Sequence, residues 1–242
     1  MTADPFAASA GAEGVPSAFA AARDTIDALL RDRGLRRRGP EVTAESLLRG
    51  AAASAALEGC PFDPATVRAE AAALDPVAAG CLRLSTQLLG GVQTFRSAPL
   101  QALARWHAVA ATGVVPETDL GRPVEPGGAA RLHALAVSLA VPTEAPALVV
   151  AAIVHAEVAT AAAFGAFDGV LARAAERVVM VARGVDPASV TVPEAGHWRL
   201  EPAYRAALDA YRGGTNAGVT HWLLHAAAAY TEGVAVAAEF AG

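Results

Sequence analysis

The strongest candidate for chemistry in this sequence is the segment Phe164-Gly-Ala-Phe-Asp168-Gly169, which separates two strongly apolar helical patterns. Its end is expected to be the N-terminus of a helix, where unpaired backbone N–H groups and the helix dipole favour an anion. Asp168 stands at an N-cap position, so its carboxylate could occupy those N–H groups and repel a phosphate. Glycine loops also serve as plain connectors, and a capped helix in an α-helical bundle is the competing interpretation.

The histidines are the second set of candidates. His221 and His225 are four residues apart in a helical pattern, the spacing of two metal ligands on one face. Trp222 stands where the related zinc motif needs a glutamate, so the pair by itself indicates packing or surface chemistry. His155 and Glu157 are two residues apart and point to different sides of a helix. A metal centre would need His155, His221 and His225 to converge in space, and we predict no metal site from the sequence.

The composition excludes several mechanisms and partners. All 19 basic residues are arginine, so the chain lacks the lysine of a Walker phosphate loop and any lysine that could form a Schiff base. Two cysteines, Cys60 and Cys81, are too few for a disulfide framework or a zinc site. The net charge of −5 argues against a nucleic-acid partner, because such proteins neutralise phosphates with a basic face.

Length and patterning indicate one large domain, or one domain with an N-terminal appendage. Of the 242 residues, 54% are hydrophobic but only 5% aromatic, so the core must consist of Ala, Val and Leu. The longest apolar stretch, residues 145–154, is far shorter than the ~20 residues of a membrane span. The N-terminus lacks the positive segment of a signal peptide. We therefore expect a cytoplasmic protein without a membrane partner.

Apolar residues at helical spacing recur along the chain between Pro and Gly, and strand signals are nearly absent. This pattern predicts an all-α bundle preceded by a disordered tail over residues 1–16. Helices are expected over 18–33, 43–59, 64–74, 76–89, 99–112, 128–139, 146–162, 170–183, 202–211 and 217–238. The helix within 147–162 is apolar nearly all round and should be central and buried. Thr43 and Gly59 are the expected N-cap and C′ residues of their helix, and His107 is expected to pack in the core.

The stretch from His155 to Arg173 resembles the core of the Fic/Doc family. The family motif, His-Pro-Phe-x-Asp/Glu-Gly-Asn-Gly-Arg-x-x-Arg, joins two buried helices. Without a gap in the alignment, Phe164, Gly169 and Arg173 match the motif. His155 falls where many members carry a histidine upstream on the same helix.

A second match lies N-terminal to the first. Ser54-Ala-Ala-Leu-Glu58-Gly59 has the Ser-x-x-x-Glu-Gly form of the helix by which many Fic enzymes inhibit themselves. The two matches together imply a Fic-like helical bundle. Its N-terminal helices would span 17–96 and include an inhibitory-type helix over 43–59, and its Fic-like core would span 97–240.

The chain departs from the family motif at the positions that carry the chemistry. Fic enzymes typically move AMP from ATP to a hydroxyl side chain. The motif histidine is the general base, the acidic residue holds Mg²⁺, and the Asn and first Arg hold phosphates. Here these four positions are Ala162, Ala166, Asp168 and Val170. A methyl group cannot take a proton, and general-base help is worth ~10²–10⁴-fold in rate. Losing the metal carboxylate and the arginine removes further charge stabilisation, so ordinary AMP transfer should be lost.

The resemblance also implies what the retained residues do. Phe164, Gly165, Asp168, Gly169 and Arg173 would form the remnant of a nucleotide pocket. In autoinhibited relatives the glutamate pairs with the second motif arginine, so Glu58 should approach Arg173 and act as a clamp between helices. Arg177, one turn further, is a competing partner for Glu58. By the same resemblance, the segment 120–127 is too brief for the hairpin that aligns target peptides in the family.

Three functions follow from these observations. The first is a Fic-like regulatory or protein-interaction module without catalysis and without a cofactor, which self-associates or binds an unknown protein and retains at most weak nucleotide binding. The alternative is a divergent nucleotidyltransferase, a protein adenylyltransferase with a rewired site in which Asp168 is a base or metal ligand. The third is an unrelated metalloenzyme on a similar bundle.

Overall fold

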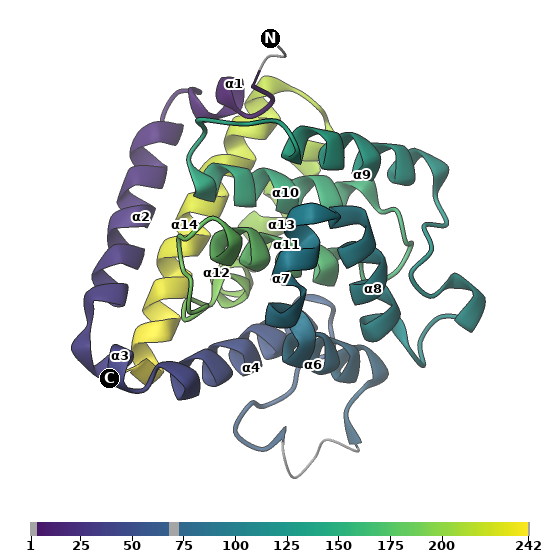
Figure 1. Ribbon diagram of the computed structural model, residues 1–242, viewed down its shortest axis with the longest axis horizontal. Coiled ribbons are helices and arrows are strands. Elements are labelled where there is room, and N and C mark those ends of the chain that lie inside the picture. Colours follow the sequence, from purple (N-terminus) through teal and green to yellow (C-terminus); the bar gives the residue numbers. More distant parts are fainter. Residues whose placement is uncertain (1–3, 68–72, 242) are drawn as a thin grey trace.

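The computed structural model describes residues 4–67 and 73–241 (Figure 1). In this part of the chain the regular elements are helices, as the all-α prediction requires. They are α1 (Ala7–Ala10), α2 (Val15–Arg31), α3 (Arg33–Arg37), α4 (Gly39–Leu57), α6 (Pro76–Leu88), η2 (Leu89–Gly91), α7 (Val92–Ser97), α8 (Pro99–Ala111), η3 (Glu117–Asp119), α9 (Pro126–Leu139), α10 (Ala147–Ala161), α11 (Asp168–Ala182), α12 (Pro193–Arg199), α13 (Glu201–Arg212) and α14 (Asn216–Ala241).

Helices α10 and α11 form the centre of the bundle (Figure 1). Helix α10 is buried on nearly every side, which confirms the interpretation of its uniformly apolar sequence. Helix α14 packs against α12, α13 and α2, while α4 and α6 pack against each other at the lower edge of the view. The short loop 162–167 joins the two central helices, so the candidate segment starts and ends on buried elements of the fold.

The expected disordered tail is wrong for residues 4–16. This segment contains α1, and Phe6 and Val15 lie in the hydrophobic core with 2% and 0% exposure. The carboxylate of Asp4 accepts hydrogen bonds from the Thr143 hydroxyl at 2.8 Å and from the Glu144 N–H at 3.1 Å. Burial of the two apolar side chains, together with this polar contact to a distant loop, offsets the entropy of ordering the segment. Residues 1–3 lie outside the described residues.

Several helix boundaries differ from the predictions. Helix α4 begins at Gly39, and Thr43 lies inside it, where its hydroxyl donates to the carbonyl of Ala188 at 2.6 Å instead of capping the helix. The end of α4 is as expected, with Gly59 at φ +83° in the C′ position. The sequence patterns did not predict α12. Of the helix expected over 64–74, residues 68–72 lie outside the described residues.

Helices on both sides of the predicted boundary at residues 96 and 97 share one core. Phe19 and Leu84 from the first part belong to the same buried cluster as Leu171 and Trp222 from the second. The division into N-terminal helices and a Fic-like core therefore stays a prediction about sequence segments. Among residues 4–67 and 73–241, no helix combines the length and the apolar character that crossing a bilayer requires.

Candidate functional site between α10 and α11

The loop between the central helices has an unusual backbone. Ala162, which ends α10, and Phe167, which precedes α11, both have positive φ, at 48° and 62°. Such conformations cost of order 1–3 kcal/mol for residues with a Cβ, so the surroundings must hold them. Phe164 and Phe167 are buried, and the carbonyl of Ala163 accepts hydrogen bonds from two backbone N–H groups of the segment 124–125. Packing and these bonds hold the loop in a strained shape.

Asp168 does not cap α11, contrary to the sequence prediction. It is the first residue of the helix, and the preceding Phe167 adopts a left-handed conformation with no side-chain cap. Because of this turn, the Asp168 carboxylate points back into the loop and accepts a hydrogen bond from the Phe164 N–H at 3.0 Å. Burial raises the pKa of Asp168, and the N–H groups of Phe164, Gly165 and Ala163 oppose that rise. The loop amides are therefore occupied by a carboxylate of the chain itself.

The raised pKa of Asp168 predicts a specific pH dependence of stability. The folded protein holds this proton more tightly than the unfolded chain, so ionisation lowers stability as pH rises through a window that begins near 3.8. We expect Asp168→Asn, which can still accept the Phe164 N–H bond, to gain stability relative to the wild type between pH 3.5 and pH 7. Thermal unfolding across this range measures the change. Asp24→Asn, at an exposed position, is the control, and a parallel response of both variants would contradict the expectation.

Glu58 and Arg173 form the expected contact. An Nη2–H of Arg173 donates to Oε1 of Glu58 at 2.6 Å, and the guanidinium also donates to the hydroxyl of Ser54 at 2.7 Å and to Tyr204 Oη at 3.1 Å. The Arg173 side chain is 2% exposed and that of Glu58 30%. A Cβ on Gly169 would lie 2.7 Å from the Glu58 carboxylate. The motif glycine therefore leaves the space in which the ion pair forms.

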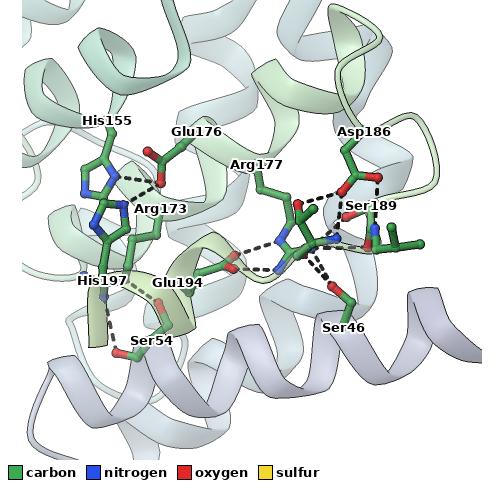
Figure 2. A network of polar contacts seen from close by, with 12 residues as sticks. Ser46, Ser54, His155, Arg173, Glu176, Arg177, Asp186, Ser189, Glu194 and His197 are labelled. Carbon is green, nitrogen blue, oxygen red and sulfur yellow. Dashed lines mark hydrogen bonds and ion pairs between the residues drawn. The ribbon is translucent and has the colours of Figure 1, made fainter. Parts of the chain in front are cut away.

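Arg177 does not compete for Glu58. Its guanidinium binds both carboxylate oxygens of Glu194, at 2.8 and 2.6 Å, and donates to the Ser46 and Ser189 hydroxyls (Figure 2). Both charged side chains are buried, and the pair joins α11 to α12 beside α4. Two arginines one turn apart on α11 thus have different partners, because Arg173 faces the C-terminal end of α4 and Arg177 faces Ser46, two turns earlier in α4, and Glu194 of α12.

A pocket of about 250 Å³ opens beside the Glu58–Arg173 pair. Gly169, Tyr204, Arg205 and Arg212 also line it. The other residues of the predicted pocket remnant lie elsewhere. Phe164 stacks on His107 with ring centroids 4.5 Å apart, and neither Phe164, Gly165 nor Asp168 lines this pocket. The structure brings together Glu58, Gly169 and Arg173 but separates them from the rest of the loop.

Comparison with known proteins shows similarity in structure and not in sequence. No protein-family model matches the sequence, and no curated protein matches it at a significant level. The crystal structure of a Fic family protein from Desulfovibrio desulfuricans G20 does match, with a TM-score of 0.76 over 94% of this chain and 75% of that chain. The fold is Fic-like. At 17% identity this similarity concerns the fold alone.

Within the Fic-like fold, three predicted motif positions carry no polar side-chain atom. Ala162 is exposed at the end of α10, Ala166 is half-buried in the loop, and Val170 is buried in the first turn of α11. His155 lies on α10 and is completely buried, away from the exposed Ala162.

The buried polar side of α11 is a feature that the sequence analysis missed. Glu176 lies between the two arginines and is completely buried. Its Oε2 contacts His155 Nδ1 at 2.9 Å and His197 Nε2 at 3.0 Å, while Tyr230 donates to its Oε1 at 2.9 Å. Contacts with the two histidines hold the pKa of Glu176 well below its usual range in spite of burial. The available signal was three charged residues, Arg173, Glu176 and Arg177, within five positions of a predicted helix.

The three histidines considered for a metal site do not converge. His155 and His225 both reach the cluster around His197, with His225 Nε2 at 3.1 Å from His197 Nδ1. His221, one turn before His225 on α14, is exposed. Burial lowers the pKa of His155 to about 4 and that of His225 to about 3, so both rings are neutral at pH 7.

Proposed function

We propose that this protein is a non-catalytic relative of the Fic enzymes that serves as a regulatory or protein-interaction module. The observation that carries the proposal is the position of the Asp168 carboxylate, which binds the N–H of Phe164 inside the loop. In the Fic motif this loop holds phosphates. A buried carboxylate in the same place supplies negative charge where a phosphate would need positive charge.

The neighbouring motif positions support the same function. Ala162 and Ala166 offer methyl groups where the base and the metal ligand of a Fic enzyme would stand, and Val170 replaces a phosphate-binding arginine. Proton transfer, metal binding and phosphate anchoring are lost together. General-base help alone contributes ~10²–10⁴-fold in rate, so restoring one group would not restore transfer.

The residues that remain have contacts that stabilise the fold. Arg173 joins α4, through Ser54 and Glu58, to α13, through Tyr204. In this interpretation the inhibitory-type pair is a structural clamp. Removing Glu58 should lower the free energy of unfolding by about 1–2 kcal/mol, less than for a fully buried pair because solvent reaches its carboxylate.

Label transfer tests the proposal directly. The wild type and Glu58→Ala are incubated with α-labelled ATP, UTP and CTP, Mg²⁺ and total cell protein. In an autoinhibited Fic enzyme, losing this glutamate would release activity. Here we expect both proteins to transfer no label above the background of a boiled sample, while Glu58→Ala remains folded by circular dichroism. Transfer that Asp168→Ala abolishes would refute the proposal and establish a rewired transferase.

One observation favours the alternative of a divergent nucleotidyltransferase. The pocket beside Glu58 is lined by Arg173, Arg205 and Arg212, a set of cations suited to phosphate groups. Its volume of about 250 Å³ is below the ~300–1,000 Å³ of typical ligand pockets, and Glu58 and Asp209 add negative charge to its lining. Titration calorimetry with ATP and AMP should show no submillimolar affinity. Submillimolar binding that requires Mg²⁺ would favour the transferase.

A further inference from the structure

Three donor atoms from three helices converge at the centre of the bundle. His155 Nδ1 on α10 and His197 Nε2 on α12 both lie at hydrogen-bond distance from Oε2 of Glu176 on α11, at 2.9 and 3.0 Å (Figure 2). All three donor atoms lie within 4.8 Å of one another. All three side chains have 0% exposure. Two imidazoles and one carboxylate at this separation are a donor set that zinc enzymes use.

The buried carboxylate of Glu176 favours a bound cation in this cluster. Glu176 has hydrogen-bond contacts with the two imidazoles, while the neighbouring arginines of α11 pair elsewhere, Arg173 with Glu58 and Arg177 with Glu194. A buried carboxylate is costly unless it is paired or coordinates a metal. The site therefore combines a buried carboxylate with two buried imidazole nitrogens.

Each of the three side chains also has a hydrogen-bond contact on its other polar atom. His155 Nε2 contacts Tyr204 Oη at 3.0 Å, and His197 Nδ1 contacts His225 Nε2 at 3.1 Å. Tyr230 fixes the second carboxylate oxygen of Glu176 at 2.9 Å. Ligands of metal sites are typically oriented in this way by a further hydrogen bond on the far ring nitrogen. The three supporting contacts therefore favour the interpretation of these side chains as metal ligands.

We propose that His155 Nδ1, Glu176 Oε2 and His197 Nε2 bind one divalent transition-metal ion, with zinc as the ion that suits the donors best. With bonds of ~2.0–2.1 Å, a tetrahedral ion separates its donors by about 3.3 Å. The two contacts to Oε2 therefore open by a few tenths of an ångström on binding. The second carboxylate oxygen or one water completes the coordination.

The ring nitrogens that face Glu176 must give up their protons for the ion to bind. When the ion binds, each ring carries its proton on the other nitrogen, Nε2 of His155 and Nδ1 of His197. His155 Nε2–H then donates to the Tyr204 oxygen, and His197 Nδ1–H donates to His225 Nε2. The Tyr204 hydroxyl keeps its own proton, and His225 carries its proton on Nδ1.

The ion would join α10, α11 and α12 at a point that solvent does not reach. Its role is structural, because a completely buried centre offers no position to a substrate. It is separate from the loop at Asp168, so the metal site and the proposed function stand or fall independently. Binding to the folded state alone adds stability in proportion to the logarithm of the free metal concentration over the dissociation constant.

Metal analysis of tag-free protein tests this inference. The protein is isolated without chelators, then unfolded with guanidinium and EDTA and refolded with or without equimolar Zn²⁺ or Co²⁺. We expect one ion per chain by mass spectrometry and a thermal unfolding midpoint several degrees higher with metal. His197→Gln should lose at least nine-tenths of the bound metal, whereas His221→Gln, which removes an exposed histidine of α14, should retain it.

The wild type decides the question if His197→Gln does not fold. X-ray absorption at the zinc edge should show two imidazoles and oxygen donors, and the cobalt form should give the visible bands of a four- or five-coordinate ion. Metal-free protein after both isolation and refolding with Zn²⁺ and Co²⁺ would overturn the proposal. Sulfur ligands from Cys60 or Cys81, or equal metal content in His197→Gln, would overturn it as well.

Discussion

Replacing Glu194 by alanine is expected to lower the free energy of unfolding by about 3–5 kcal/mol, because the variant leaves the Arg177 cation buried and unpaired. Arg177 and Glu194 share two hydrogen bonds of 2.8 and 2.6 Å, and their side chains are only 2% and 7% exposed. The remaining contacts of Arg177, to Ser46 and Ser189, are neutral and cannot replace the carboxylate. Urea denaturation followed by circular dichroism measures the loss.

Two further variants separate the charge effect from a general effect of mutation. Asp27→Ala removes a partner of Arg23 in an exposed i, i+4 pair and should cost less than ~1 kcal/mol. The double variant Arg177→Met, Glu194→Leu removes both charges from the same place and should recover most of the loss. If Glu194→Ala were as mild as Asp27→Ala, the pair would not be buried in solution.

Gly196→Ala is expected to lower the free energy of unfolding by an amount at the upper end of the ~1–3 kcal/mol that is typical of overpacking. A Cβ at this position would lie 1.9 Å from the carbonyl oxygen of Ala229 and 3.0 Å from the backbone N of Gly233. Both atoms are backbone of α14, so relief requires α12 to move away from it as a unit. His197, the next residue, would move with it.

Gly127→Ala is the matched control for this substitution. Gly127 lies in the first turn of α9, is exposed, and has nothing within 4 Å of the added Cβ. Alanine there should stabilise the helix by up to ~1 kcal/mol. Guanidinium denaturation of the two variants should therefore give changes of opposite sign. Equal changes would mean that α12 and α14 are not in backbone contact.

The residues that this chain shares with the Fic motif are those with packing roles. Gly169 leaves room for the Glu58–Arg173 pair, and Arg173 joins three helices. Under the proposed function, Ala162 and Ala166 stand where a Fic enzyme would carry its general base and its metal ligand. Packing residues and reacting residues contribute to different free energies, so the proposal is compatible with the Fic-like fold.

Much of the fold could be predicted from the sequence. Apolar spacing identified α10 as the buried centre, and the positions of Pro and Gly separated most of the helices. The resemblance to the Fic family implied a contact between Glu58 and Arg173, 115 residues apart in the chain, and the contact is present at 2.6 Å. Helical periodicity is a local property of the sequence, and a motif matched at fixed spacing transfers the arrangement of its helices with it.

The tertiary structure alone decided which polar groups meet. His155, Glu176 and His197 are 21 residues apart in each step and lie on three helices, one of which the sequence patterns did not predict. The partner of Arg177 depended on the position of α12. The direction of the Asp168 carboxylate depended on the left-handed turn at Phe167. Such contacts depend on the relative position of several helices to within an ångström, and a pattern along one helix carries no information on the helix that faces it.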